Sequence, residues 1–208
     1  MTRIGASSKF WNRSGTERAY GKTGGWEISM VGDVLPAPIR VSRAGIWNFA
    51  EAAATKLNFR PGDSIEPLVS RLGGRIEYKD VPGTGEVPES IVVRSARDFT
   101  IFLPTMTSPG RNRFTIAHEL GHLFLHYPGV KRQTPNARMV ARRWVDENDV
   151  DQQRAEWEAN WFAAAFLMPR EIFTSTYNRR GARDAAVVFG VSVQSAQIRA
   201  KSLGLEPV

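Results

Sequence analysis

The segment His118-Glu119-Leu120-Gly121-His122 places two histidines four positions apart. Residues four apart share one face of an α-helix, so this spacing predicts a helix in which both imidazoles point the same way. Both rings can then reach one divalent metal at bonds of about 2 Å. Glu119 lies one step round the helix, beside the metal, where its carboxylate can accept a proton from water as a general base.

A catalytic zinc usually takes three protein ligands, so two histidines are not sufficient. The chain has 3 His and no Cys, which leaves His126 or a carboxylate as the third ligand. His126 lies about 12 Å along the helix axis from His118, too far to share one ion. We expect His126 to be a hydrogen-bonded or packed histidine, and a carboxylate to complete the site.

The helix predicted from Asp151 to Met168 offers two such carboxylates, Glu156 and Glu158. Glu156 belongs to a stripe of small or polar residues at helical spacing that can lie close against the helix of the two histidines; its other members are Asn160, Ala163, Ala164 and Leu167. Glu158 points away from this stripe and is expected to be a solvated charge. The acidic cluster Asp146 to Asp151 remains a less favoured source.

Local patterns predict the other elements. Further helices are expected from Ser42 to before Pro61, near 64–72, from a cap at Asn112 to Pro128-Gly129, and in the C-terminus; strands are expected at 75–78, 90–94 and 99–103. The last two strands form a hairpin in a small antiparallel sheet. Residues 130–150 read as a loop or a loosely held helix.

Composition narrows the class of protein. The absence of cysteine excludes disulfides, iron–sulfur clusters and thiolate zinc sites. Apolar residues make up 42% and charged residues 24% of the chain, which is typical of a globular protein. No apolar run has the length of a membrane helix or a signal peptide, so we expect a cytoplasmic protein without membrane contact. The net charge of +7 would attract nucleic acid or an acidic partner.

Residues 113–126, followed by 156–169, resemble the ImmA/IrrE family of metallopeptidases, and the resemblance extends over about Arg43 to Leu205. It implies a gluzincin-like α+β fold, in which a small antiparallel β-sheet packs on a helical zincin-like core. It also implies one Zn²⁺ per chain, held by His118, His122 and Glu156, with Glu119 as the catalytic residue.

Three regions are expected along the chain: a glycine-rich basic N-terminal arm (1–40), a zinc metallopeptidase domain (41–180), and a helix-turn-helix-like C-terminal hairpin (181–208) that packs on the peptidase domain. Such a hairpin can also bind DNA. The residues that would then contact DNA are Gln194, Ser195, Gln197 and Lys201.

The leading hypothesis is a zinc-dependent endopeptidase whose substrate is a transcriptional repressor or similar helix-turn-helix regulator, as the family implies, in stress response or in mobile-element or toxin–antitoxin control. The alternative is a DNA- or regulator-binding module with a structural or degenerate metal site. An extended substrate could pair with the sheet near Phe99 to Leu103. Tyr127, Tyr177 and several arginines are candidates for stabilising the oxyanion, and the oligomeric state stays open.

Overall fold

The computed structural model of the chain describes residues 32–80, 88–146 and 148–206. By its contacts the chain divides into two units, Met1–Met30 and Val31–Val208, and all described residues belong to the second. Most of the arm predicted for residues 1–40 therefore lies outside the described residues. In the part that the structure describes, no helix is long and apolar enough to cross a membrane.

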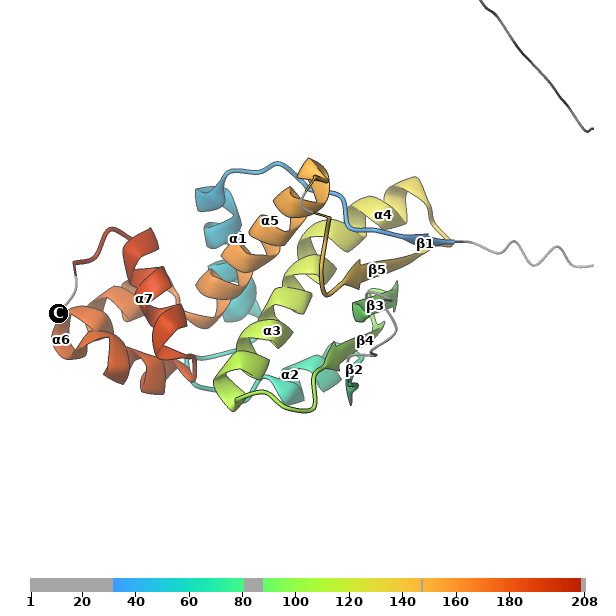
Figure 1. Cartoon of the computed structure of the whole chain (residues 1–208). Helices are drawn as coiled ribbons and strands as arrows, with labels where there is room; N and C mark the ends of the chain where they lie inside the picture. Colours follow the sequence, from blue (N-terminus) through green and yellow to red (C-terminus); the bar gives the residue numbers. More distant parts are fainter. Residues whose placement is uncertain (1–31, 81–87, 147, 207–208) are drawn as a thin grey trace, which may run out of the picture. The chain divides into compact units, whose positions relative to one another are not determined.

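Helices form most of the described unit (Figure 1). In chain order they are α1 (Arg43–Lys56), α2 (Glu66–Arg71), α3 (Pro109–Gly121), the π-helical turn η1 (His122–His126), α4 (Tyr127–Gln133), α5 (Val150–Leu167), α6 (Arg170–Phe189) and α7 (Val193–Ser202). The predicted cap of the first helix is confirmed, because the Gly45 amide donates to Oγ of Ser42.

Five strands form one sheet in the order β1-β5-β3-β4-β2. They are β1 (Asp33–Val34), β2 (Gly74–Tyr78), β3 (Glu89–Ser95), β4 (Asp98–Leu103) and β5 (Arg138–Arg142). The predicted α+β class and the β3–β4 hairpin are confirmed. The sheet is mixed rather than wholly antiparallel, because β2 pairs with β4 in parallel and β1 pairs with β5 in parallel.

Two predictions about the sheet are wrong. Phe99–Leu103 lies in β4, which has β2 on one side and β3 on the other, so this strand offers no free edge to a substrate. Residues 138–142, expected in a loop or loose helix, form β5. Their three central residues, Met139, Val140 and Ala141, are buried, but basic residues on both sides hide this short apolar run in the sequence.

The helix of the two histidines is longer than predicted. It begins after Ser108, with Pro109 at its first position, and Asn112 uses its side chain to accept a hydrogen bond from Thr107 instead of capping. It does not end at Pro128-Gly129 either, because η1 and α4 continue it to Gln133. Pro128 stands directly after the π-helical turn, in which the Tyr127 amide donates to the His122 carbonyl.

Helix α5 lies between α1 and α3 and packs against both (Figure 1). At Gly121 the backbones of α3 and α5 come very close: a Cβ at this position would lie 3.0 Å from Cα of Ala159. Any larger residue here would push the two helices apart by a few tenths of an ångström, so glycine allows their close approach. Because Ala159 is about one helical turn after Glu156, the contact brings the Glu156 carboxylate to the histidine face of α3.

Candidate metal centre

The structure brings together His118 of α3, His122 at the start of η1 and Glu156 of α5. Nε2 of His118 lies 3.1 Å from Oε2 of Glu156, and Nε2 of His122 lies 3.2 Å from Oε1 of the same carboxylate. The two imidazole Nε2 atoms are 3.1 Å apart. Two imidazole nitrogens and one carboxylate, from α3, η1 and α5, therefore converge.

This group fits a divalent metal. A tetrahedral zinc with bonds of 2.0–2.1 Å holds its ligand atoms about 3.3–3.4 Å apart, close to the separations observed. His118, His122 and Glu156 are a set that could bind a metal among the described residues. The acidic cluster has other partners: Asp149 caps α5, and Asp151 pairs with Arg40.

Neighbouring side chains orient both imidazoles. Oδ1 of Asn160 lies 3.1 Å from Nδ1 of His118, and because an amide oxygen can only accept, Nδ1 of His118 carries the proton. Nε2 of His118, which faces Glu156, is then the atom that would bind a metal after losing its proton. Asn160, one turn after Glu156, thus supports the same histidine that Glu156 approaches.

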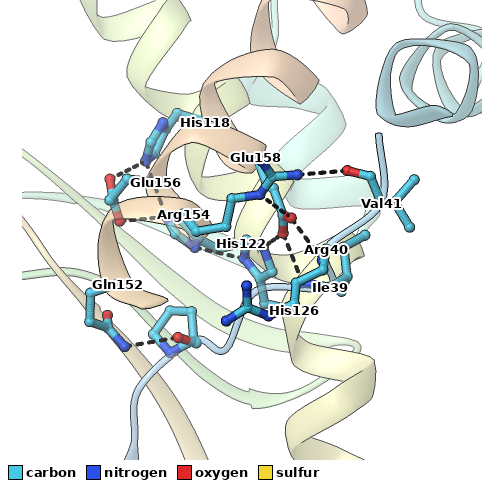
Figure 2. A network of polar contacts seen from close by, with 11 residues as sticks. Ile39, Arg40, Val41, His118, His122, His126, Gln152, Arg154, Glu156 and Glu158 are labelled. Atoms are coloured by element: carbon cyan, nitrogen blue, oxygen red, sulfur yellow. Dashed lines mark hydrogen bonds and ion pairs between the residues drawn. The ribbon is translucent and has the colours of Figure 1, made fainter. Parts of the chain in front are cut away.

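The second imidazole is oriented through a buried chain of hydrogen bonds (Figure 2). Nε2 of His126 lies 3.2 Å from Oε2 of Glu158, and Nδ1 of His126 lies 3.0 Å from Nδ1 of His122. The carboxylate accepts from His126, so Nδ1 of His126 must accept from His122. Nε2 of His122 is then left with its lone pair toward Glu156. His126 is a hydrogen-bonded histidine, as predicted.

The prediction that Glu158 is a solvated charge is wrong. Its side chain is 0% exposed, since residues 35–41 pass over this face of α5. The amides of Ile39 and Arg40 each donate to it at 2.8 Å, and Nε of Arg154 donates at 3.0 Å. Burial opposes its charge, but the hydrogen bonds from His126, the Ile39 amide and Arg154 keep the pKa of Glu158 below its usual range.

Glu119 lies beside this group and is 2% exposed. Oγ of Ser90, in β3, donates to Oε2 of Glu119 at 3.1 Å. Burial raises the pKa of Glu119 to about 7, with opposing effects from the charges of His118 and Glu156. A carboxylate with a pKa near neutrality can both accept and release a proton at physiological pH. The sequence analysis did not foresee Ser90, which only strand packing brings to Glu119.

The charges of the two histidines and Glu156 depend on one another. Burial opposes the charge of His118, but Glu156 outweighs it and raises the pKa of His118 to about 9. Burial lowers the pKa of His122 to about 4. The pKa of Glu156 is held well below its usual range: burial acts against this, and the hydrogen bond and positive charge of His118, with the contact to His122, prevail. His118 and Glu156 thus stabilise each other's charged forms.

A pocket of about 450 Å³ opens onto His118, Glu119 and Glu156. Three arginines also line it: Arg111, Arg142 and Arg143. Tyr127 and Tyr177, two earlier candidates for stabilising an oxyanion, are not among its lining residues. Nη2 of Arg143 donates to the Phe102 carbonyl, while its buried Nε has no partner among the described residues.

The fold and the site define a peptidase-like α+β domain with a candidate metal centre. The IrrE N-terminal-like domain family (Peptidase_M78) matches residues 70–201, more than half of the chain, and the chain belongs to this family. The resemblance to ImmA/IrrE metallopeptidases is therefore confirmed. The family is one of peptidases in which metal dependence is typical.

A solved structure described as a Mycobacterium tuberculosis transcriptional regulator is similar to the chain, with a TM-score of 0.52 and 19% sequence identity. The match covers 76% of this chain and 46% of the regulator, so the chain spans about half of that protein. At this identity the likeness concerns the fold alone. None of the curated proteins compared with the chain matches it.

Proposed function

We propose that the chain is a zinc-dependent endopeptidase that cleaves a protein substrate, with His118, His122 and Glu156 as metal ligands and Glu119 as the catalytic base. The observation that carries the proposal is the convergence of two imidazole nitrogens, 3.1 Å apart, on the two oxygens of Glu156 at 3.1 and 3.2 Å, beside a buried carboxylate whose pKa is about 7. A binding module has no need of a proton acceptor at this place.

In the proposed reaction, bound zinc supplies a Lewis acid that polarises the scissile carbonyl and makes water more acidic. Glu119 accepts a proton from the attacking water and then delivers it to the leaving amine. Ser90 holds the carboxylate of Glu119 in place through its hydrogen bond. Asn160 and His126 keep the two imidazoles in the tautomers that leave Nε2 unprotonated.

Arg143 is the residue that we assign to the developing oxyanion. It lines the pocket next to Glu119, its Nε is buried without a partner among the described residues, and its charge lowers the pKa of Glu119. A fixed cation in a partly dehydrated pocket stabilises negative charge that appears in the transition state. Tyr127 is a weaker candidate because its hydroxyl donates to the Arg94 carbonyl.

For the substrate we propose a transcriptional repressor or similar helix-turn-helix regulator, cleaved in the cytoplasm in stress response or in mobile-element or toxin–antitoxin control. Membership of the IrrE N-terminal-like family supports this class of substrate. The three arginines that line the pocket would favour a cleaved segment with acidic side chains, since they place positive charge around it.

The test compares the zinc-loaded chain with its Glu119→Gln variant on a cell extract, with new peptide N-termini identified by mass spectrometry. We expect the variant to lose about 10²–10⁴-fold of the cleavage rate, because the proton acceptor is removed while the ligands remain. Both proteins should hold equal zinc. Equal cleavage by the two proteins would contradict the proposal.

A DNA- or regulator-binding module is the second candidate, and one observation favours it. Gln194, Gln197 and Lys201 are exposed on α7, and the chain carries a net charge of +7. Ser195 is only partly exposed, and its amide donates to Oγ of Ser192 at the start of α7. Binding of a DNA fragment that Lys201→Glu weakens and Glu119→Gln leaves unchanged would support this candidate.

A further inference from the structure

A second pocket, of about 530 Å³, lies beside the metal pocket and is not used by the proposed reaction. Helices α1, α3, α5 and α7 line it, and we call it the Trp47 pocket. The lining residues that matter for its chemistry are Arg43, Trp47, Phe114, Asn160, Trp161 and Arg199. Its volume is typical of a site for a small molecule.

The buried guanidinium of Arg199 is the central feature of the Trp47 pocket. Its side chain is 0% exposed; Nε donates to the Met168 carbonyl at 3.1 Å, and Nη2 pairs with Glu51 at 3.3 Å. Nη1 of Arg199 and Nε1 of Trp47 are buried, and neither has a hydrogen-bond partner among the described residues. Two residues that line one pocket therefore each hold a buried donor without an acceptor, which is costly unless something supplies it.

Positive charge is also in excess here. The guanidinium carbons of Arg199, Arg43 and Arg170 lie 4.6, 5.0 and 5.5 Å from the centre of the Trp47 ring. Glu51 is the carboxylate paired with this cluster, and none of the described residues that line the pocket is acidic. Burial, together with the charges of Arg170 and Arg43, lowers the pKa of Arg199 to about 10. An anion would relieve this repulsion.

Aromatic side chains form part of the other walls, beside polar residues of α7. Phe114 and Trp161 line the pocket together with Trp47. Aromatic side chains bind a planar apolar body well, whereas a carboxylate has two oxygens that can accept from two separate donors. We propose that the Trp47 pocket binds a small organic carboxylate with a planar apolar body, whose oxygens accept from Nη1 of Arg199 and Nε1 of Trp47.

This site has a direct connection to the metal centre. Asn160 lines both pockets, and its Oδ1 accepts from Nδ1 of the candidate ligand His118. A carboxylate bound against Asn160 is therefore in a position to change how firmly His118 is held. By linkage, the carboxylate and zinc then change each other's affinity by the same factor.

The binding test titrates 2-naphthoate, and separately its neutral analogue 2-naphthamide, into the full chain by calorimetry. The titrations are run on metal-free and on zinc-loaded protein, because a carboxylate can also bind zinc directly. We expect one naphthoate site in both forms and about tenfold weaker binding of the amide, which lacks the charge. Equal binding of the two probes, or naphthoate binding only with zinc present, would overturn the proposal.

Three variants locate the binding. Ala164→Phe fills the pocket from α5 without removing a hydrogen bond of Arg199, and should abolish binding. Arg43→Gln removes an exposed cation at the Trp47 ring and should weaken binding several-fold. Arg180→Gln removes the same charge from an exposed position on α6 and should change nothing. Unaltered binding by a folded Ala164→Phe variant places the probe elsewhere and refutes the site.

The connection to the metal is tested by zinc competition with a chelator, with and without saturating naphthoate. We expect the zinc affinity of the wild type to change at least about threefold and that of Ala164→Phe to stay constant. This readout involves no proteolysis, so it succeeds or fails independently of the proposed peptidase activity. No change in the wild type would refute the coupling.

Discussion

Two carboxylates of α5 stand two residues apart and meet opposite ends of one row of histidines. Glu156 contacts His118 and His122 at the end that opens to the pocket, and its side chain is 24% exposed. Glu158 contacts His126 at the closed end and is 0% exposed. The two glutamates have the same side chain but different surroundings. Glu156 is partly open to solvent, whereas Glu158 is covered by residues 35–41.

The two glutamates differ in the number of hydrogen-bond donors that their carboxylates accept from. Glu158 accepts from two backbone amides, Arg154 and His126, so its oxygens are saturated. Glu156, by contrast, contacts the two imidazoles, which are themselves potential ligands. The open carboxylate can exchange a proton-bearing partner for a metal ion, whereas the closed one can only orient its neighbours. The following changes test this contrast.

The largest effect is expected from Glu156→Ala. Removing a ligand atom from the open end should reduce zinc from about one ion per chain to almost none, because two histidines hold the ion much less firmly than three ligands. Metal content after gel filtration in chelator-free buffer measures this. Glu171→Ala, an exposed carboxylate of α6, is the matched control and should keep its zinc. Full zinc in Glu156→Ala would remove Glu156 from the ligand set.

At the closed end, Glu158→Ala should act on stability. The change leaves Arg154, His126 and the amides of residues 39 and 40 without their acceptor, and breaking a buried ion pair costs about 3–5 kcal/mol. Urea unfolding of the metal-free protein measures the free energy of unfolding. A loss below about 1 kcal/mol would mean that Glu158 is not the anchor of residues 39–41.

His126→Phe tests whether zinc binding depends on the orientation of the His122 ring as well as on the ligand atoms. The variant removes the acceptor for Nδ1 of His122 but no ligand atom, so zinc should still bind once per chain with an affinity about 10–100-fold lower. Competition with a chelator gives this affinity. Tyr127→Phe is the control, since the Tyr127 hydroxyl has only a long 3.4 Å hydrogen bond to the Arg94 carbonyl. An unchanged zinc affinity in His126→Phe would show that the hydrogen bond to His126 does not orient the His122 ring for metal binding.

The smallest expected effect is a pH dependence at the open end. The pKa of His118 in the folded, metal-free protein is about 9, above its unfolded value of about 6.5. Its contribution to stability is therefore complete below pH 6.5 and is lost as the pH rises to 9. We expect metal-free protein to lose about 1 kcal/mol or more over this range, measured by urea unfolding.

Two comparisons make this pH effect specific. His118→Gln has no titrating group at this position and should lose less stability between pH 6.5 and 9. Zinc-loaded protein should also lose less, because the ion replaces the proton on His118. A loss of equal size in all three proteins would assign the titration to other groups.

Local patterns in the sequence were sufficient to predict which helix faces form the candidate metal site and where the β3–β4 hairpin lies. The four-residue spacing of His118 and His122 predicts a shared helix face, and the stripe that contains Glu156 and Asn160 predicts which side of α5 meets it. Both depend only on the helical period, which is a property of the chain itself. The β3–β4 hairpin was likewise readable from alternation and a short connection.

Tertiary structure decided the rest. The burial of Glu158, the contact of Ser90 with Glu119 and the place of Arg143 in the pocket join residues far apart in the sequence. So do the parallel pairing of β2 with β4 and the strand β5. Short apolar or charged segments carry no period that identifies their neighbours. Whether a carboxylate is solvated or saturated depends on what packs over it, and for Glu158 that is a segment 118–119 residues away.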